Sequence, residues 1–561
     1  MTTHPAHHRP HLPSSEAARR RRRKRLLVPL AVAMLGVLAA VGAFVVLGGD
    51  DRSEIANQYG AAYAKGDYAG MYALLSASDR RAMNVQRFAE LQQEARETAT
   101  VEKITAGLAV DAGEDRYSVP VKVQTRLFGE LSGQLLLPVL KDGQTSAVDW
   151  SQALSFPGLK QGEKLRRTTT LPTRADILAS DGTVLVRGAD RIPNTDTALS
   201  SIVGQMGPIP AEDKSAYAKA GVPADASVGL TGLERVFEAR LRGQPGGTLY
   251  AGDREIASTE PAEASPVRST IQPSVQRAAV TTLGDRLGGI AVVKPSNGAI
   301  LALAGAAFSG LQPPGSTFKI ITTTAALRFG DAKPSTVYPV ETAATLSGVE
   351  LQNADGESCG GTLVESFVHS CNSVFGPLGA KVGGEHLVET AEAFGFNEEL
   401  GIPGAAVSTM PSAEELGDDE LVLGSTAIGQ GRLQATALQM ALVAATIGER
   451  GMRPKLTLEA GQAAQQTRVI PRTVGSQVTT MMAGVVSRGT GVLAKVDGVK
   501  AAGKTGTAEL RTTQGDCDPE NPPPGGCPDA SDTTDTTAWF AGFAPSSSPK
   551  VAIAVQLVGQ G

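Results

Sequence analysis

The chain has 561 residues, of which 41% are hydrophobic and 19% are charged, and its formal net charge at pH 7 is -5. This is the composition of an ordinary globular protein with room for about three to four domains, and it argues against collagen-like or largely disordered chains. The excess of basic over acidic residues is confined to the start of the chain, so no nucleic acid is expected as a partner.

The first 48 residues predict a basic tail and a membrane anchor. Residues 1–25 carry eight Lys and Arg residues against Glu16 alone, and residues 26–48 contain no charged residue. As a helix, the second run is long enough to cross the apolar core of a bilayer, about 30 Å thick. Basic residues stay on the cytoplasmic side, so we expect a single-pass protein in the cell membrane, with the tail inside and the rest extracytoplasmic.

A cleaved signal peptide is the alternative interpretation of this start. Val41-Gly42-Ala43 would be an acceptable cleavage site. The apolar run continues beyond Ala43 and exceeds the usual core of a signal peptide, so we prefer a retained anchor.

Residues 51–160 predict a small α+β domain. Helices are expected at residues 55–65, 68–75 and about 88–94, followed by strands at 117–123, 133–139 and 146–150. The order of helices and then a curved sheet is that of a cone-shaped domain. No residue in it indicates catalysis.

Residues 166–266 predict an extended, loop-rich linker domain. The composition shifts toward Pro, Gly and charged residues, with a strand, turn and strand around Asp181-Gly182. Further on, Gly232-Leu233-Glu234 opens a short helix that ends before Gly243.

Residues 270–561 form the largest block and predict helices that cover an antiparallel sheet of about five strands. A hairpin joins residues 290–293 to 299–303, and further strands are expected at 499–507, 538–544 and 550–558. Residues 436–447 are apolar but too short to cross a membrane, so we expect a core helix there. Residues 511–537, polar and rich in Pro and Gly, predict an exposed insertion between two strands.

The four cysteines, Cys359, Cys371, Cys517 and Cys527, all lie in the part expected outside the cytoplasm, where disulfides form. Two local pairs, Cys359 with Cys371 and Cys517 with Cys527, are the simplest of three connectivities. Free thiols remain the alternative. The spacings suit no zinc site, and we expect neither metal nor cofactor.

The first catalytic candidate is a serine and a lysine three residues apart. After the turn Pro313-Pro314-Gly315, residues 316–329 predict a helix that Gly330 ends. Ser316 and Lys319 would share one face of this helix, where a desolvated lysine can accept the serine proton. The pattern alone is weak, because Ser547 and Lys550 repeat it in a segment that Pro549 keeps from being a helix.

Two later motifs strengthen the first. Ser370-Cys371-Asn372 and Lys504-Thr505-Gly506-Thr507 each occur once, in this order. With Ser316 and Lys319 they form the three-part signature of penicillin-binding proteins and serine β-lactamases. His369 and His386 are the histidines beyond the tail, and His369 is a weaker candidate base because no motif includes it.

On these motifs, residues 51–561 resemble a class B penicillin-binding protein, the monofunctional D,D-transpeptidase kind, with an N-terminal domain similar to nuclear transport factor 2. Further matching segments are Gly232-Leu233-Glu234, Gly429-Gln430-Gly431, Gly489-Thr490-Gly491 and residues 539–545. No segment before the linker resembles a glycosyltransferase domain, which argues against class A.

The resemblance implies an α+β, membrane-anchored, multidomain protein. Its domains would be a tail at 1–25, a transmembrane helix at 26–48, a nuclear transport factor 2-like cone at 51–160, a linker or dimerisation domain at 166–266, and a transpeptidase domain at 270–561 with a fold like that of the serine β-lactamases. Relatives usually add a helix after the last strand, whereas this sequence ends at Gly561, so we expect that face of the sheet to be covered in another way or less stably.

The resemblance also implies roles for the motif residues. Ser316 would attack the carbonyl between the two D-alanines of a peptidoglycan stem peptide, with Lys319 as its base. Ser370 would relay a proton to the leaving amine, and Asn372 would orient Lys319 and the substrate amide. Lys504, Thr505, Gly506 and Thr507 would bind the substrate carboxylate, and the backbone N–H groups of Ser316 and Thr507 would form the oxyanion hole.

The expected function is therefore a peptidoglycan D,D-transpeptidase that β-lactams inhibit covalently, with a lipid-II-polymerising membrane glycosyltransferase as a partner. A D,D-carboxypeptidase, in which water takes the acyl group, is the alternative within the same chemistry. A non-catalytic β-lactam sensor or cell-wall scaffold is the alternative from another class. A β-lactamase would need a deacylating base, which the sequence does not identify. Cys371 inside the second motif and the insertion at 511–537 are departures that affect the rim of the site.

Overall fold

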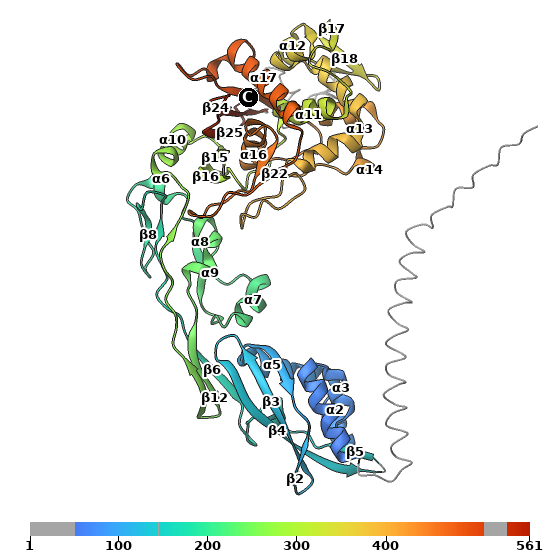
Figure 1. The fold of residues 1–561 in the computed structure, drawn as a ribbon, viewed down its shortest axis with the longest axis vertical. Helices are drawn as coiled ribbons and strands as arrows, with labels where there is room; N and C mark the ends of the chain where they lie inside the picture. The colour runs from blue at the N-terminus through green and yellow to red at the C-terminus, as the bar shows by residue number, and fades with distance from the viewer. Residues whose placement is uncertain (1–50, 144, 510–535, 561) are drawn as a thin grey trace, which may run out of the picture. The chain divides into compact units, whose positions relative to one another are not determined.

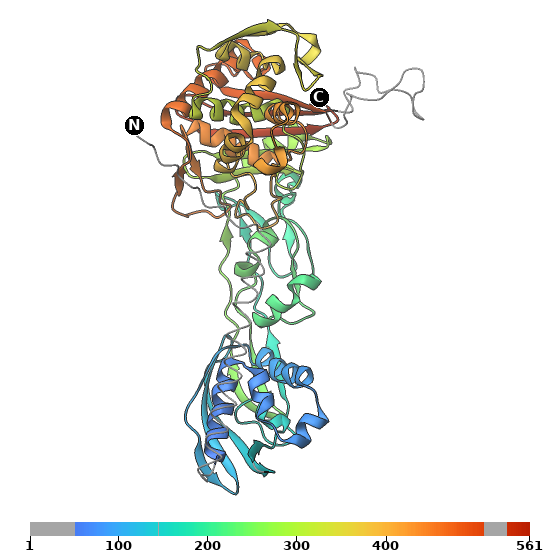
Figure 2. The same ribbon diagram turned by 90° about the vertical axis from the view of Figure 1, so that its right-hand side faces the viewer.

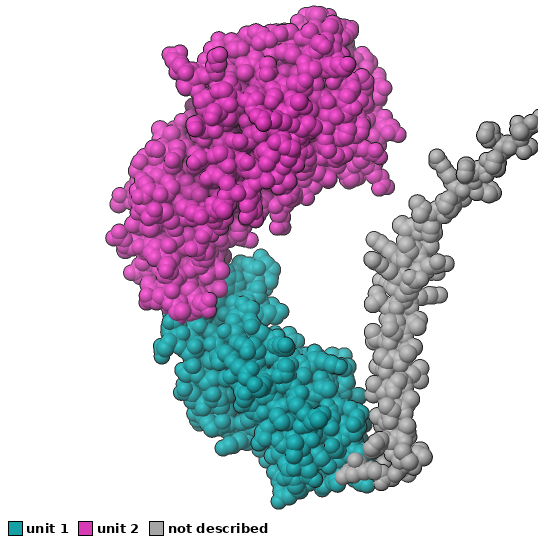
Figure 3. Space-filling model, in the orientation of Figure 1, with its two compact units in different colours: residues 1–171, 210–224, 245–261 teal, residues 172–209, 225–244, 262–561 magenta. Residues whose placement is uncertain are grey.

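The computed structural model describes residues 51–143, 145–509 and 536–560, and it divides into two compact units (Figure 3). Unit 1 comprises residues 1–171, 210–224 and 245–261, and unit 2 comprises residues 172–209, 225–244 and 262–561. The predicted tail, the predicted membrane helix at 26–48, Cys517 and Cys527 lie outside the described residues. Within the described ranges, no helix has the length and apolar character needed to cross a membrane.

The N-terminal part of unit 1 begins with helices α2 to α5 (Figures 1 and 2). Short polar side chains fix three of their starts, because Asp67, Ser76 and Asn84 each accept a hydrogen bond from a backbone N–H in the first turn of the helix that follows. The bounds are α2 (Arg52–Lys65), α3 (Tyr68–Ala73), α4 (Ala77–Ala82) and α5 (Val85–Thr98).

These helices pack on an antiparallel sheet with the strand order β1-β3-β4-β5, in which β2 also pairs with β3. Side chains of β3 alternate between buried and more exposed positions, so one face of the sheet joins the helices in a core that includes Tyr59, Phe88 and Leu137. The helices and strands are where the sequence predicts them, with α4, β1 and β2 in addition. The strands are β1 (Val101–Ala106), β2 (Val110–Gly113), β3 (Arg116–Thr125), β4 (Gly129–Asp142) and β5 (Thr145–Val148).

Unit 1 also contains a three-stranded antiparallel sheet with the order β13-β12-β6. Its strands come from distant parts of the chain, and Leu249 of β12 packs into the same core as Phe88. The elements are β6 (Leu165–Thr170), α7 (Lys214–Lys219), β12 (Gly246–Ala251) and β13 (Arg254–Thr259).

The first part of unit 2 consists of short elements around a buried ion network. Arg174 donates to Glu234 at 2.8 Å and to Glu238 at 2.7 Å, and Arg191 also pairs with Glu234. The strand, turn and strand predicted around Asp181-Gly182 are present as β7 and β8. The elements are β7 (Ile177–Leu178), β8 (Val184–Arg187), β9 (Ile192–Pro193), α6 (Thr197–Ser200), β10 (Met206–Pro208), β11 (Ser227–Gly229), α8 (Gly232–Val236), α9 (Glu238–Leu241) and β14 (Val267–Arg268).

The centre of unit 2 is a five-stranded antiparallel sheet with the order β16-β15-β25-β24-β23. As predicted, it unites the hairpin before Ser316 with the three strands near the end of the chain. The strands are β15 (Gly288–Lys294), β16 (Ala299–Gly305), β23 (Ala502–Glu509), β24 (Thr536–Ala544) and β25 (Val551–Val558).

Both faces of this sheet are covered. Alternate residues of β15 belong to different cores: Ala291 and Val293 pack with the large helical core, whereas Ile290 and Val292 pack with α10 (Pro273–Leu283). The fully buried helix α16 (Ala437–Gly448) lies on the face that carries Ala291 and Val293. Helix α17 (Arg472–Arg488) lies beside α16 and packs against β23 (Figure 1).

The remaining elements surround the end of the sheet near β23. The helices are α11 (Lys319–Phe329), α12 (Leu363–Val368), α13 (Asn372–Ala393), α14 (Ala413–Leu416) and α15 (Glu420–Ala427). The strands are β17 (Val337–Glu341), β18 (Ala343–Leu346), β19 (Val349–Gln352), β20 (Cys359–Thr362), β21 (Met452–Pro454) and β22 (Gln466–Arg468). Short 3₁₀ turns occur at Gly315–Phe318, Ala354–Gly356 and Val492–Ala494.

Candidate active site

The first motif lies at the start of α11, beside strand β23. The sequence predicts a helix from Ser316, whereas the structure has a 3₁₀ turn at Gly315–Phe318 and α-helix only from Lys319. Gly315 has a positive φ of 51°, and a Cβ atom there would collide with the carbonyl oxygen of Thr507. Glycine is therefore required for the close approach that brings Ser316 to the sheet.

Lys319 is the centre of the polar network, and its side chain is fully buried. Its Nζ atom lies 3.0 Å from Ser316 Oγ and 3.2 Å from Ser370 Oγ. It also donates at 2.6 Å to the backbone oxygen of Ser370 and to Oδ1 of Asn372. The structure thus unites both halves of the first motif with both polar residues of the second.

Ser370 lies in the turn between α12 and α13 with a φ of 64°, which is unusual for a residue other than glycine. Such strained backbone persists only where its surroundings fix it, and it is frequent at functional sites. In this conformation Ser370 Oγ lies between two lysine amines. Lys504 Nζ donates a hydrogen bond to it at 2.8 Å, and Lys319 Nζ lies on its other side.

Lys504 of β23 is also fully buried and donates to the backbone oxygen of Thr505 at 3.0 Å. Burial lowers the pKa of Lys504 to about 7. Burial, and after it the charge of Lys504, lowers the pKa of Lys319 well below the usual value for lysine. No carboxylate among the described residues pairs with either amine in this site, and a neutral Lys319 can accept a proton from Ser316.

The rest of the third motif continues along β23. Thr505 Oγ1 shares a hydrogen bond of 2.6 Å with Thr490 Oγ1, and Thr507 is exposed. A Cβ atom on Gly506 would lie 2.9 Å from Pro314 O and from Thr317 N, so this strand runs directly along the Ser316 turn. That proximity places the backbones of Ser316 and Thr507 side by side, as an oxyanion hole requires.

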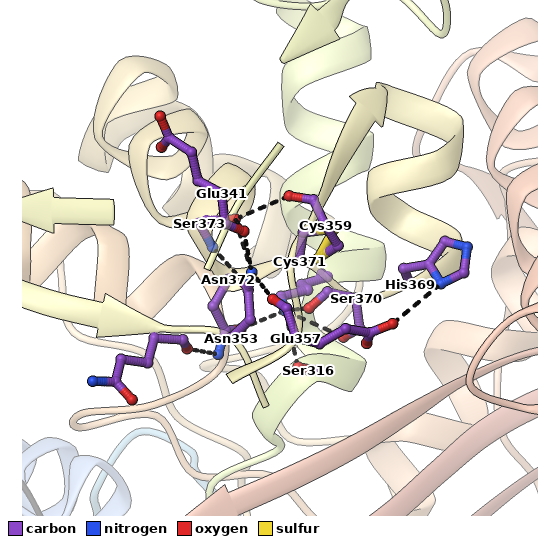
Figure 4. The surroundings of a disulfide bond; sticks show 12 residues. Ser316, Glu341, Asn353, Glu357, Cys359, His369, Ser370, Cys371, Asn372 and Ser373 are labelled. Atoms are coloured by element: carbon purple, nitrogen blue, oxygen red, sulfur yellow. Dashed lines mark hydrogen bonds and ion pairs between the residues drawn. A yellow bond between two sulfur atoms is a disulfide. The ribbon is translucent and has the colours of Figure 1, made fainter. Parts of the chain in front are cut away.

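A disulfide bond joins Cys359 to Cys371, the middle residue of the second motif (Figure 4). It is one of the two local pairs weighed from the sequence, and the other pair lies outside the described residues. His369 faces Glu357, with Nδ1 4.0 Å from Oε1, and within the described residues it forms no hydrogen bond or ion pair with Ser316 (Figure 4).

Three neighbours of the site lie outside its three motifs. Thr490 precedes β23 and bonds to Thr505, Gln352 accepts a hydrogen bond from Asn372, and Asn353 contacts the residue after Asn372. Thr490 and Gly429 lie in segments that resemble the family, and Gly429 O accepts from Gly315 N at 2.9 Å. For Gln352 and Asn353 the sequence offers no signal.

Three family models match the chain in the order that these features suggest. They are the NTF2-like N-terminal transpeptidase domain at residues 52–163, the penicillin-binding protein dimerisation domain at 186–266, and the penicillin binding protein transpeptidase domain at 288–561.

Similar proteins agree with the models. The peptidoglycan D,D-transpeptidase PbpA of Mycolicibacterium smegmatis is 32% identical over 386 residues, which is 58% of this chain and 74% of that protein. PbpA of Mycobacterium tuberculosis is 31% identical over 394 residues, with the same two coverages.

Solved structures show the same relationship. The crystal structure of PBPA from Mycobacterium tuberculosis is similar with a TM-score of 0.53 and 25% identity, covering 69% of this chain and 93% of that chain. The D,D-transpeptidase domain of a peptidoglycan glycosyltransferase from Eggerthella lenta gives a TM-score of 0.54 at 26% identity, with 69% and 94% covered. With the three domains, the three motifs and these relatives, the chain belongs to the class B penicillin-binding proteins, the family of monofunctional peptidoglycan D,D-transpeptidases.

Proposed function

We propose that this protein cross-links peptidoglycan stem peptides through an acyl-enzyme on Ser316, and that β-lactams acylate the same oxygen. The observation that carries the proposal is the buried Lys319 Nζ, 3.0 Å from Ser316 Oγ and held by Asn372 Oδ1. Burial lowers the pKa of this amine well below the usual value for lysine, which favours the neutral form that can accept a proton.

In the first half-reaction, Lys319 takes the hydroxyl proton of Ser316 while Oγ attacks the carbonyl carbon between the two D-alanines. The tetrahedral oxyanion is stabilised by the backbone N–H groups of Ser316 and Thr507. The C–N bond then breaks, an ester forms on Ser316, and the leaving amine takes a proton that Ser370 relays from Lys319. Ser370 suits this role because its Oγ contacts both lysine amines.

In the second half-reaction, an amine from another stem peptide attacks the ester carbonyl. The ester C–O bond to Ser316 breaks as the amide cross-link forms, and the proton that the amine loses passes through Lys319 to Ser316 Oγ. Before acylation, Lys504, Thr505 and Thr507 along β23 can bind the carboxylate of the terminal D-alanine, which leaves when the ester forms. Structures of PBPA from Mycobacterium tuberculosis include a ceftriaxone acyl-enzyme complex, which supports β-lactams as covalent ligands of this chain.

The proposal extends to location and partner. The uncharged run at 26–48 after a basic tail supports a single-pass anchor with the catalytic domain outside the cytoplasm. A monofunctional transpeptidase needs glycan strands made elsewhere, which supports a lipid-II-polymerising membrane glycosyltransferase as its partner.

Labelling with a fluorescent penicillin tests the proposal. Wild type should be labelled covalently and Ser316→Ala should not. Ser547→Ala is a matched control, because Ser547 has the same spacing to Lys550 but is exposed and lies in no helix. Labelling of Ser316→Ala at the wild-type rate would overturn the assignment of the nucleophile.

A donor and acceptor peptide assay separates the two enzymatic outcomes. Incubation with a peptide ending in D-Ala-D-Ala and a peptide amine should give the cross-linked product. Free D-alanine and trimmed peptide alone, at saturating amine, would instead indicate a D,D-carboxypeptidase.

A further inference from the structure

The helix that carries Asn372 begins without a cap of its own. Helix α13 starts at Asn372, and its N-cap position is occupied by Cys371. Among the described residues, Cys371 makes no side-chain hydrogen bond to the first turn of α13. The first N–H groups of a helix need acceptors from elsewhere, so this start depends on another segment.

Asn353 supplies that acceptor from the loop after β19. Its Oδ1 accepts from the backbone N–H of Ser373 at 2.8 Å, and its Nδ2 donates at 2.8 Å to the backbone oxygens of Glu341 and Glu357 (Figure 4). The side chain is 5% exposed. One buried amide therefore ties the first turn of α13 to two other points of the chain.

Two further links hold the same place. The disulfide fastens Cys371, between Ser370 and Asn372, to the start of β20 (Figure 4). The backbone oxygen of Gln352 accepts from Nδ2 of Asn372 at 2.8 Å, which turns the amide so that Oδ1 faces Lys319. Both half-cystines are buried.

The site needs such support because the second motif is strained. Ser370 has a left-handed backbone, and its carbonyl oxygen is one of the two acceptors that lie 2.6 Å from Lys319 Nζ. Strained backbone relaxes when its neighbours no longer fix it. A shift of Ser370 and Asn372 would move the amine away from Ser316 Oγ.

We propose that Asn353 and the Cys359–Cys371 disulfide are positioning groups for acylation: they hold Ser370 and Asn372 so that Lys319 stays aligned with Ser316. Among the described residues, neither group forms a hydrogen bond with the side chain of Ser316 or Lys319. The inference rests on the proposed function, because it concerns the acylation of Ser316.

The test measures how fast fluorescent penicillin V acylates the purified full-length protein. The kinetics are resolved into the dissociation constant Ks of the non-covalent complex and the acylation rate constant k2. In Asn353→Ala, k2 should fall about tenfold to a hundredfold, the effect of a small misplacement of catalytic groups. Ks should change little, because the carboxylate-binding strand β23 is not held by Asn353. If a variant were only partly folded, the total amount of labelled protein would fall, but the k2 of its folded fraction would stay at the wild-type value.

Gln276→Ala is the matched control. Gln276 is also a buried amide that clamps backbone, since it donates to Leu303 O at 2.8 Å and accepts from Leu303 N at 2.9 Å, but it contacts no residue of the site. It should lose thermal stability and keep the wild-type k2. An equal fall of k2 in Gln276→Ala would overturn the proposal, as would an unchanged k2 in Asn353→Ala.

The double variant Cys359→Ala, Cys371→Ala provides a second test that stands if Asn353→Ala does not fold. Its k2 should also fall with Ks retained, and a wild-type k2 would overturn the role of the disulfide. Failure of the proposed function is distinguishable, because wild type itself would then not be labelled on Ser316.

Discussion

Lys319 Nζ lies 2.6 Å from Oδ1 of Asn372, a residue 53 positions further along the chain. This contact joins the start of α11, directly after the Ser316 turn, to the start of α13, where the second motif ends. The contact holds the Lys319 amine in place, and burial disfavours the charged form of that amine. Lys319 Nζ stays within hydrogen-bond distance of Ser316 Oγ.

Replacement of Lys319 by arginine should abolish most acylation although arginine is also a basic residue. A guanidinium stays protonated at any accessible pH, so it cannot accept the serine proton. Loss of a general base typically costs about a hundredfold to ten-thousandfold in rate. Stopped-flow labelling should show this fall in k2, and Lys550→Arg, from the second Ser-x-x-Lys pattern, should react like wild type.

The pH dependence of acylation should have an acidic limb set by Lys319. Its pKa is lowered by burial and then by Lys504, so the neutral, basic form grows as the pH rises through that lowered pKa. Acylation should therefore remain fast well below the ordinary pKa of lysine, about 10.4. A rate that rises only near that ordinary value would contradict a lowered pKa.

Binding of the substrate carboxylate should weaken above neutral pH. Burial lowers the pKa of Lys504 to about 7, so its positive charge is present below that pH and is lost above it. Ks for an anionic penicillin should therefore increase between about pH 7 and 9. At pH 6, Lys504→Gln should bind the penicillin more weakly than wild type, with a larger Ks. Its Ks should be nearly independent of pH across this range.

Gly429→Ala should damage the site more than Gly431→Ala. Both glycines have positive φ, 88° and 74°, so both substitutions carry backbone strain. A Cβ atom on Gly429 would collide with the carbonyl of Gly315, whereas no described atom lies within 4 Å of one on Gly431. Displacement of Gly315 disturbs the Ser316 N–H, and loss of an oxyanion donor costs about a hundredfold to a thousandfold in rate. Equal acylation rates in the two variants would contradict this account.

Arg174→Ala should destabilise unit 2. Arg174 contacts Glu234, whose side chain is 1% exposed, and Glu238. Removal of one partner from a buried ion network costs about 3 to 5 kcal/mol because a buried charge is left unpaired. Arg240→Ala, which removes a half-exposed pair between Arg240 of α9 and Glu459, should cost about 1 kcal/mol or less. Thermal unfolding of both variants measures the difference.

The sequence predicts much of this site because the three motifs combine chemistry with fixed backbone requirements. Ser316, Lys319, Ser370, Asn372 and Lys504 were expected to converge, and the structure brings them together. The 3₁₀ turn at Gly315–Phe318 was not expected, because it depends on the approach of the Thr507 carbonyl from a strand nearly two hundred residues away.

Support for the second motif was beyond what the sequence could show. Asn353 acts through the backbone of Glu341, Glu357 and Ser373, and an asparagine that bonds to main-chain atoms leaves no pattern in the chain. The pair Cys359–Cys371 belongs to the simplest of the three connectivities and is confirmed, but the sequence does not show that this disulfide holds the second motif in place. The order of helical, linker and sheet segments could be predicted from the sequence because hydrophobic periodicity and turn residues are local signals.

The most direct test of the central claim is peptide mass spectrometry of wild type after reaction with a thioester analogue of a stem peptide and then with an acceptor amine. The account predicts an acyl group on the peptide that contains Ser316, its disappearance when the amine is added, and the appearance of the cross-linked amide. An acyl group on another residue, or cross-linking that persists in Ser316→Ala, would contradict it.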